Sequence, residues 1–434
     1  MIKRKKLFCL LALIVIFTIA LGVYHDRRTC WGSNDFDTYY FAGKIITTGE
    51  NVYTHTVFKT ALSPYLYLPF FAILIAPLTF LDMRVAAVIW YVLNILVFVG
   101  AIRLSVRLLG SDEKFRRIFY AKPYLLRIAS LVVLLVIWLD NVSLAQIDFM
   151  MFFLIVLSFF MYERKKAFLS GIILAAASVI KIYPAYLLLY LIAKRRFAAV
   201  AGFFVGIFLF VFAVPYLVMG PESFKDTMKS WVEIKAAPQL KPCGETVKEN
   251  YARFDSQFKP SNQSFSAVVT RFFTKDDPDV IYWKEKSYEY RIPWPHPLSP
   301  RQVDMLIKIL LLAVVAVTYA FLDYRLVYRD KLYLSIEYSV VLLSMVLFFP
   351  VVQTHMFAYM TLPIIVLNYI KTKRNEKWIY GEKWMEIAFY AVIVIYALQA
   401  DEYMKVFGAG AFSIVLLWML FVAILVKERA RRKS

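Results

Sequence analysis

Apolar runs of about twenty residues alternate with short basic tracts along most of the chain. Each run is long enough to cross a hydrocarbon core of roughly 30 Å as an α-helix. Backbone polar groups cannot stay unpaired in lipid, and barrel-like alternation is absent, so the runs indicate helices. The pattern predicts an all-α polytopic membrane protein with about twelve transmembrane helices. The expected spans are 7–23, 85–106, 124–139, 143–161, 167–181, 183–193, 198–219, 303–323, 332–349, 356–370, 384–399 and 407–426.

Basic tracts between the apolar runs set the expected orientation. When the runs are threaded alternately across a membrane, the Lys- and Arg-rich tracts fall on one side together with both termini. These tracts include 103–127, 164–166 and 194–196. The positive-inside rule assigns that side to the cytoplasm. The segments 24–84 and 220–302 then lie outside, as a first external loop and a large external loop of a single transmembrane domain over 1–434.

Two stretches do not fit a simple span. The run 68–81 is short and contains two prolines, and if it crossed, the basic tract 103–127 would lie outside. We therefore expect an interfacial or re-entrant helix there, so that the external loops carry juxtamembrane helices. The arm 183–193 is too short to span unaided, so it should form a hairpin with 167–181. The hairpin would turn at Lys181–Pro184, near the outer leaflet.

Composition supports a membrane protein and leaves little room for other classes. The chain is 61% hydrophobic with a mean hydropathy of +0.60, above the half-apolar level of soluble domains. A net charge of +20 suggests nucleic acid in a soluble protein, but here the basic residues cluster between apolar runs. We expect no nucleic-acid partner. Cys30 and Cys243 fall on the expected outer side; free thiols are favoured, although a disulfide is permitted.

No cofactor or metal is expected from the motifs. The sequence contains no Gly-rich phosphate loop, CxxC pair, HExxH or GxSxG motif, and only four His. The candidate chemistry lies in polar residues next to the expected outer helix ends, where a membrane protein normally avoids them.

The first candidates are Asp35, Asp37 and Lys181. Either Asp follows the first span and could take a proton from an acceptor hydroxyl, but an Asp can also cap a helix that starts near Thr38. Lys181 lies in an apolar hairpin. A bound phosphate would compensate its charge there, and snorkelling to the interface is the alternative.

Three further polar groups lie on the same expected side. Gln146 and Asp148 begin an otherwise apolar helix and are more polar than capping requires. The tripeptide 262–264 lies in the large external loop and is followed by Arg271. His355 ends a short turn, where a lone His is more often structural. Used together, these groups would suit a protein that acts from outside on a phosphate-bearing lipid.

These motifs, in this order, resemble glycosyltransferase family 87 of the GT-C superfamily. The matching segments are Asp35-Phe36-Asp37-Thr38-Tyr39-Tyr40, Tyr65-Leu66-Tyr67-Leu68-Pro69, Ala145-Gln146-Ile147-Asp148, Lys181-Ile182-Tyr183-Pro184 and Asn262-Gln263-Ser264. The sequence departs from the family pattern in three places. Leu68 stands where the family has Pro, and Ala145 stands where it has Gly. The last motif, Ser-Pro-x-x-Trp-x-His-His, survives only as Pro350 and His355.

The resemblance implies a GT-C fold and an inverting glycosyltransferase. Such an enzyme moves a sugar, mannose by family, from a polyprenyl-phosphate donor to a lipid- or glycan-linked acceptor at the outer face of the plasma membrane. Asp35 would be the general base, Lys181 would bind the donor phosphate, and His355 would assist at the donor or acceptor. The residues implied to bind substrate are Asp37, Tyr39, Tyr40, Tyr67, Gln146, Asp148, Asn262, Gln263, Ser264 and Arg271.

Two other functions remain as alternatives. A lipid-linked-glycan transporter or flippase should show inverted repeats and charges near the midplane of several helices, and neither is apparent. An O-antigen ligase or polymerase should concentrate Arg and His in the large loop instead of placing an Asp after the first helix.

The threading predicts that position 111 is cytoplasmic and position 230 external. Cysteines introduced singly at Ser111 and Ser230 test this with a membrane-impermeant thiol reagent applied to intact cells. The three native cysteines are first replaced by serine, because Cys30 and Cys243 are expected on the outer side and would react themselves. We expect labelling at position 230 only, because the reagent reaches only the outer face. Labelling at position 111 would overturn the threading.

Overall fold

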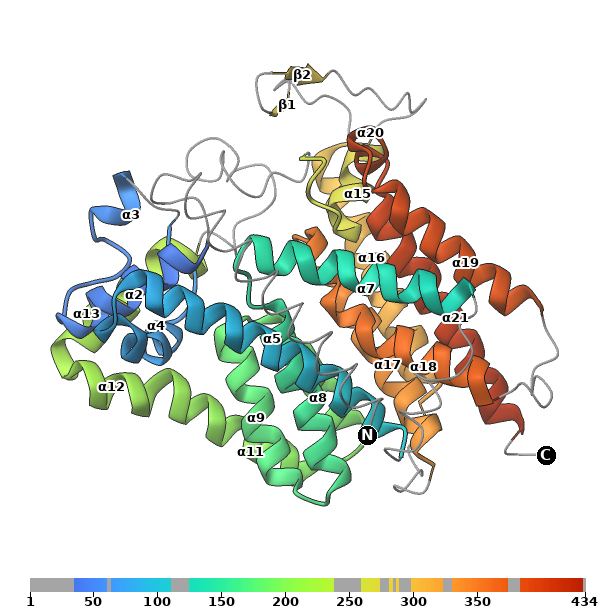
Figure 1. Ribbon diagram of the computed structural model, residues 1–434, viewed down its shortest axis with the longest axis horizontal. Helices are drawn as coiled ribbons and strands as arrows, with labels where there is room; N and C mark the ends of the chain where they lie inside the picture. The colour runs from blue at the N-terminus through green and yellow to red at the C-terminus, as the bar shows by residue number, and fades with distance from the viewer. Residues whose placement is uncertain are drawn as a thin grey trace, which may run out of the picture. The chain divides into compact units, whose positions relative to one another are not determined.

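The computed structural model describes residues 35–60, 64–110, 125–237, 259–273, 281–283, 286–288, 298–322, 330–373 and 383–431. The first expected span, Cys30 and Cys243 lie outside these residues. The described chain is helical, apart from one antiparallel strand pair, β1 (Ile281–Trp283) and β2 (Lys286–Tyr288) (Figure 1). The expected all-α fold class is confirmed for the described residues, with this three-residue strand pair as a local exception.

The chain divides into two compact units. The first contains Met1–Leu104, Trp138–Ala185 and Phe197–Leu240, and the second contains Ser105–Ile137, Tyr186–Arg196 and Lys241–Ser434. The boundary therefore falls inside the segment 220–302, which contributes to both units. Helix α7 (Leu125–Ser143) starts in the second unit and ends in the first.

The first unit is built from short and long helices. Its elements are α2 (Asp35–Thr47), α3 (Val57–Thr60), α4 (Pro69–Ile75), η1 (Ala76–Phe80), α5 (Met83–Leu108), α8 (Asp148–Glu163), α9 (Ala167–Ile180), η2 (Tyr183–Tyr186), α11 (Phe197–Ile207), η3 (Phe208–Ala213), α12 (Val214–Met219), α13 (Pro221–Trp231) and η4 (Val232–Ala236). The last residues of α5 and η2 extend into the second unit.

The second unit contains the remaining helices and the strand pair. Its elements, besides β1, β2 and the first part of α7, are α10 (Leu187–Ala193), α15 (Phe265–Phe273), α16 (Pro300–Ala320), α17 (Lys331–Leu347), η5 (Thr354–Met360), α18 (Thr361–Lys373), α19 (Lys383–Leu398), α20 (Glu402–Val406) and α21 (Ala409–Arg431).

Helices long and apolar enough to cross a membrane support a membrane location. In the described part of the chain four qualify: Met83–Leu108, Phe197–Met219, Arg301–Ala320 and Ala409–Ala430. A fifth would be α7 with α8, which are bent by 120° relative to each other. The expected count of about twelve spans is not confirmed, because many of the other apolar runs form helices of 17 residues or fewer. Short or broken helices are tolerated at membrane depth where protein covers their ends.

The turn between α7 and α8 differs from the expected one. Helix α7 continues to Ser143 and α8 begins at Asp148, so the turn comprises 144–147 and not 140–142. The asparagine and aspartate that precede Val142 are thus helical, and Asn141 is buried. The polar stretch was misread as a turn because Asn and Asp favour turns in general.

The segment 68–81 forms the short helical element that its sequence predicts. Pro69 occupies the first position of α4, where its missing N–H removes no hydrogen bond. The element packs against α2, where Gly43 leaves room for the backbone of Ala76. Its position relative to a bilayer stays a prediction.

Helices α8, α9 and α11 pack side by side within the first unit (Figure 1). The connection between α8 and α9 is the basic tract 164–166, in which Lys165 has a φ of 63°. Gly171 on α9 and Gly202 on α11 bring those two helices together, since a Cβ at either position would overlap the facing backbone. Helices α8 and α9 form a hairpin of their own, in which the N-terminus of α8 lies beside the C-terminus of α9.

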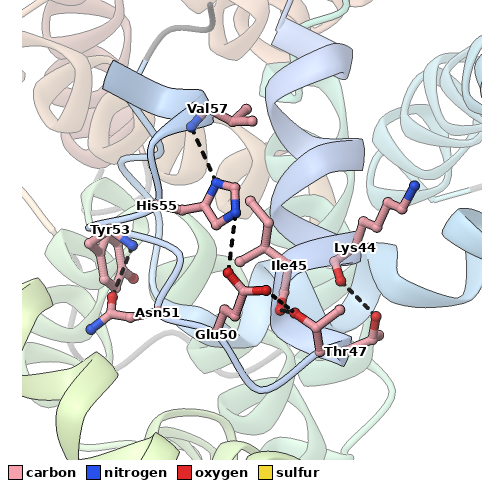
Figure 2. Close-up of polar contacts among 9 residues, drawn as sticks. Lys44, Ile45, Thr47, Glu50, Asn51, Tyr53, His55 and Val57 are labelled. Carbon is pink, nitrogen blue, oxygen red and sulfur yellow. Dashed lines mark hydrogen bonds and ion pairs between the residues drawn. The ribbon is translucent and has the colours of Figure 1, made fainter. Parts of the chain in front are cut away.

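The loop after α2 is held by its own polar side chains (Figure 2). The Nδ1 atom of His55 accepts a hydrogen bond from the Val57 N–H at 3.2 Å, so Nε2 carries the hydrogen that faces Glu50 at 3.2 Å. The Asn51 side chain accepts from Tyr53 N–H. It also donates to Asp226 and Ser230 at 2.6 and 2.8 Å. Through Asn51 the loop is fixed to α13.

Helix α17 forms the core of the second unit, and it contains a buried charge. Every residue from Tyr333 to Leu347 is buried, including Glu337. The Glu337 carboxylate lies 2.8 Å from Lys194 Nζ and accepts a hydrogen bond from the Tyr190 hydroxyl at 3.2 Å. Lys194 belongs to a tract expected on the cytoplasmic side, and its side chain is nevertheless only 2% exposed because Glu337 compensates its charge.

Neutralising Glu337 alone should destabilise the protein strongly. The substitution Glu337→Gln leaves the Lys194 ammonium buried without its counter-ion, which typically costs about 3–5 kcal/mol. Adding Lys194→Met restores neutrality, so the double variant should unfold within about 1 kcal/mol of the parent. Unfolding of the purified protein in detergent measures both.

The matched control is Asp304→Asn, which breaks the exposed Asp304–Lys308 pair on α16. It should change the free energy of unfolding by at most about 1 kcal/mol, because exposed ion pairs contribute little. A double variant as unstable as Glu337→Gln alone would show that charge compensation is not what Glu337 provides.

Candidate active site

Asp35 lies at the start of α2, directly against the turn between α7 and α8. Its carboxylate accepts a hydrogen bond from the Gln146 side-chain amide, and its backbone N–H donates to Leu144 O at 3.3 Å. The structure thus presents Asp35 as a carboxylate whose orientation is fixed by Gln146 and by the backbone of the turn.

Asp37 and Tyr40 lie on the same helix, α2. The expectation that Asp37 caps a helix beginning near Thr38 is wrong, because α2 already begins at Asp35 and both carboxylates lie in its first turn. Residues two apart on a helix do not share a face, so Asp37 does not follow Asp35 toward Gln146. The Tyr40 hydroxyl donates to Leu81 O at 2.8 Å and so ties α2 to the end of η1.

The turn that holds Asp35 has a strained backbone. Ala145 has a φ of 55°, the left-handed region that glycine tolerates best. Its carbonyl accepts a hydrogen bond from the buried Trp90 indole at 3.2 Å, and the Gln146 N–H donates to Asn141 O at 2.8 Å. These bonds keep the Gln146 side chain aimed at Asp35. Local strain of this kind concentrates at functional sites.

Lys181 forms an ion pair with Asp148. Its ammonium lies 3.0 and 2.8 Å from the two carboxylate oxygens, and the Asp148 side chain is fully buried while that of Lys181 is 12% exposed. Asp148 begins α8 and Lys181 follows the last residue of α9, so each charge complements the dipole of its helix end. Snorkelling and a bound phosphate were the two expected compensations for Lys181, and the structure supplies a third.

Tyr39 and Tyr67 form an aromatic wall beside these carboxylates. Their hydroxyls are 3.1 Å apart, and the Tyr39 ring contacts Phe71 and Trp90 with centroid distances of 5.1 and 5.7 Å. Burial raises the pKa of both tyrosines well above the usual value, and the charge of Asp35 adds to the increase. Both phenols therefore stay protonated and can act as hydrogen-bond donors and not as bases.

The other candidate residues belong to the second unit, where they bind backbone groups. Asn262 donates to Pro350 O at 3.2 Å and accepts from Val352 N–H at 3.2 Å. Gln263 donates to Lys405 O at 2.7 Å and accepts from Gly410 N–H at 2.9 Å.

Ser264 and Arg271 complete this polar bracket. The Ser264 hydroxyl donates to Pro350 O at 2.9 Å and accepts from Ala267 N–H at 3.1 Å, which caps the N-terminus of α15. The Arg271 guanidinium donates to Asn262 O at 2.9 Å and Val406 O at 3.0 Å, and burial lowers its pKa to about 10. We interpret the four side chains as a structural bracket, and substrate binding by them stays a prediction.

His355 is buried in η5, with 3% of its surface exposed. It belongs to the second unit, so the implied site residues fall into two groups, one in each unit. The group in the first unit is Asp35, Asp37, Tyr39, Tyr40, Tyr67, Gln146, Asp148 and Lys181. The assisting role of His355 stays a prediction.

Trp90 is the site residue that the sequence analysis missed. It supports the strained turn through Ala145 O and contacts the Tyr39 ring. An indole within an expected membrane span was a possible signal, because a buried Trp N–H usually needs a partner.

Comparison with known proteins gives a consistent result. A model described as Glycosyltransferase family 87 matches residues 65–350. The chain is 29% identical over 164 residues, 37% of its length and 35% of the relative's, to a polyprenol-phosphate-mannose-dependent alpha-(1-2)-phosphatidylinositol pentamannoside mannosyltransferase of Mycobacterium tuberculosis. It is also 29% identical over 211 residues, 48% of its length and 47% of the relative's, to the protein of the same description from Mycolicibacterium smegmatis.

A third relative, from Mycobacterium tuberculosis, is a polyprenol-phosphate-mannose-dependent alpha-(1-2)-phosphatidylinositol mannoside mannosyltransferase, 29% identical over 246 residues, which are 52% of this chain and 54% of the relative. The matched regions span from about a third to about half of these relatives. No solved structure matches the chain.

Substitutions of Ala145 should raise or lower the free energy of unfolding, depending on how easily the new residue adopts a left-handed backbone conformation. Ala145→Gly removes a left-handed strain of about 1–2 kcal/mol, partly offset by the larger entropy that glycine loses on folding. We expect a net gain of up to about 1 kcal/mol. Ala145→Val should lose about 2 kcal/mol or more, because a β-branched residue is a poorer fit to this region. Thermal unfolding of the purified protein measures both.

Ala175→Gly, inside helix α9, is the matched control. It should lose roughly 0.5–1 kcal/mol, because glycine weakens a regular helix. If Ala145→Gly were as destabilising as Ala175→Gly, the left-handed conformation of Ala145 would not be the native one.

Proposed function

Because this chain belongs to glycosyltransferase family 87, we propose that it is an inverting glycosyltransferase that transfers a sugar from polyprenyl phosphate to a hydroxyl of a lipid- or glycan-linked acceptor. The observation that carries the proposal is the group of polar residues in the first unit. There the Gln146 side chain orients the Asp35 carboxylate. Asp148, two residues after Gln146, forms the ion pair with Lys181.

Asp35 acts as the general base. Its carboxylate removes the proton of the acceptor hydroxyl as that oxygen attacks the anomeric carbon, and Gln146 keeps the carboxylate oriented. The family match begins at residue 65, so the role of Asp35 is supported by this geometry and by the motif around it, not by the matched range.

Lys181 stabilises the leaving group. As the new glycosidic bond forms, the bond between the anomeric carbon and the phosphate oxygen breaks, and the electron pair stays on that oxygen. The phosphodiester donor thereby becomes a more highly charged phosphomonoester, polyprenyl phosphate. A nearby ammonium offsets the developing charge, which is electrostatic stabilisation of the transition state. The balanced reaction uses no cofactor.

The substrates are proposed as classes. The relatives are named for polyprenol-phosphate mannose and for phosphatidylinositol mannosides, which favours mannose as the sugar and a glycolipid as the acceptor. The hydroxyls of Tyr39 and Tyr67 share one hydrogen bond, which uses one of their two O–H donors, so the other hydroxyl can donate a hydrogen bond to a sugar. We propose as well that the whole chain acts as one catalytic domain with a GT-C fold. Its termini would be cytoplasmic and its site would lie on the outer face of the plasma membrane.

Substituting Asp35 and Asp37 separately tests the mechanism. Asp35→Asn keeps an acceptor for Gln146 but cannot take a proton, so transfer should fall roughly a hundred- to ten-thousand-fold. Asp37→Asn should keep most of its activity, because the charge it removes interacts with the α2 dipole by only about 0.3–1 kcal/mol. The assay is release of polyprenyl phosphate and radiolabelled glycolipid by purified protein supplied with polyprenyl-phosphate mannose.

Both variants should express and unfold like the parent. The reverse pattern of activity would assign the base to Asp37, and two active variants would exclude this mechanism. A protein that moves lipid-linked sugar across vesicles without releasing polyprenyl phosphate would be a flippase. Mass spectrometry of glycolipids from a deletion strain then identifies the acceptor.

A further inference from the structure

The Asp148 carboxylate cannot be reached from solvent in the structure. Its side chain is 0% exposed and that of Lys181 is 12% exposed, so an approaching anion meets the ammonium while the carboxylate lies behind it. A ligand could touch Asp148 only after the ion pair had separated. This arrangement is unlike that of a substrate-binding carboxylate, the role that the resemblance implied for Asp148.

The ammonium keeps one hydrogen-bond donor beyond those used by Asp148. A lysine ammonium carries three N–H donors, and two of them are directed at the carboxylate oxygens, at 3.0 and 2.8 Å. The remaining N–H can bind a phosphate oxygen while the ion pair stays intact. Binding of the donor therefore does not require Asp148 to move.

We propose that Asp148 is a positioning residue that holds the Lys181 ammonium and limits its affinity for phosphate, so that polyprenyl phosphate is released after each transfer. This inference rests on the proposed function. It adds a role for a buried carboxylate that touches neither the sugar nor the phosphate.

The physical reason is the change in charge during the reaction. The phosphodiester donor carries one negative charge, and the phosphomonoester product carries more than one near neutral pH. A lone ammonium in a partly buried site would attract the product more strongly than the donor, because Coulomb attraction grows with ligand charge and is weakly screened there. A carboxylate about 3 Å behind the ammonium reduces both attractions and reduces that of the product most.

The fold holds the pair in place before any ligand arrives. Asp148 begins α8 and Lys181 follows α9, and the two helices form one hairpin. A buried hydrogen bond between Ser158 and Ser170, at 3.0 Å, links the same helices farther along. The position of the Lys181 ammonium is therefore fixed before a ligand binds, as a positioning role of Asp148 requires.

The test is Asp148→Asn, which removes the charge, keeps one oxygen acceptor for Lys181 and replaces the other oxygen by an amide NH2. Three quantities are measured on purified protein: KM for polyprenyl-phosphate mannose, kcat, and the dissociation constant of polyprenyl phosphate determined by direct binding. We expect roughly tenfold or greater tightening of product binding, which corresponds to a modest change in electrostatic attraction. The KM should fall, and kcat should also fall, with a rapid first turnover followed by slow release.

Asp304→Asn is the charge-matched control. It removes the same charge from an exposed pair on α16, so all three quantities should stay at the parent values. The double variant Asp148→Asn with Lys181→Met lacks the ammonium and should not bind the product more tightly. If Asp148→Asn does not fold, Asp148→Glu retains the charge and should keep the parent dissociation constant for polyprenyl phosphate.

Each outcome decides between the two roles. Weaker product binding and a higher KM in Asp148→Asn would overturn the inference and make Asp148 a substrate ligand. Tighter binding by Asp148→Glu would overturn it as well. If the parent transfers no sugar but Asp148→Asn binds polyprenyl phosphate more tightly, the proposed function fails, and only the effect of Asp148 on the phosphate affinity of Lys181 stands. If the parent transfers sugar and Asp148→Asn binds product as the parent does, only this inference fails.

Discussion

The turn between α7 and α8 is the constraint on which the candidate active site depends. Gln146 in this short segment orients Asp35, and Asp148, the first residue of α8 directly after it, holds Lys181. Ala145 must adopt a left-handed conformation for both to point correctly, and the Trp90 indole supports it through the backbone carbonyl. The proposed base and the proposed phosphate ligand are thus coupled through the backbone of a single turn and not through direct contact.

Buried charge is compensated in the same way in both units. Lys181 pairs with Asp148 in the first unit, and Lys194 pairs with Glu337 in the second. Lys181 precedes the short arm 183–193 and Lys194 follows it, so a buried ion pair lies next to each end of the arm. An uncompensated charge in a low-dielectric interior is expensive, whereas a well-placed pair with further hydrogen bonds is tolerated.

Hydropathy was sufficient to locate the helices but not to describe their ends. The expected run 198–219 corresponds to the continuous stretch Phe197–Met219, whereas the run 124–139 extends to Ser143. A helix end depends on which backbone groups find partners, and such partners come from distant segments. Asp35, for example, starts α2 against Leu144 O. No local pattern in the sequence contains that contact.

The side-chain partners in the candidate site were even less predictable from local sequence than the helix ends. Charge and position singled out Asp148 and Lys181, but they are 33 residues apart and nothing local indicates that they pair. The tripeptide 262–264 and Arg271 show the converse case. Their side chains bind the backbone of 350–352 and 405–410, so polar residues beside a membrane span can be explained by backbone groups that lack another partner. A polar motif near a membrane is therefore evidence for substrate binding only after its backbone contacts are known.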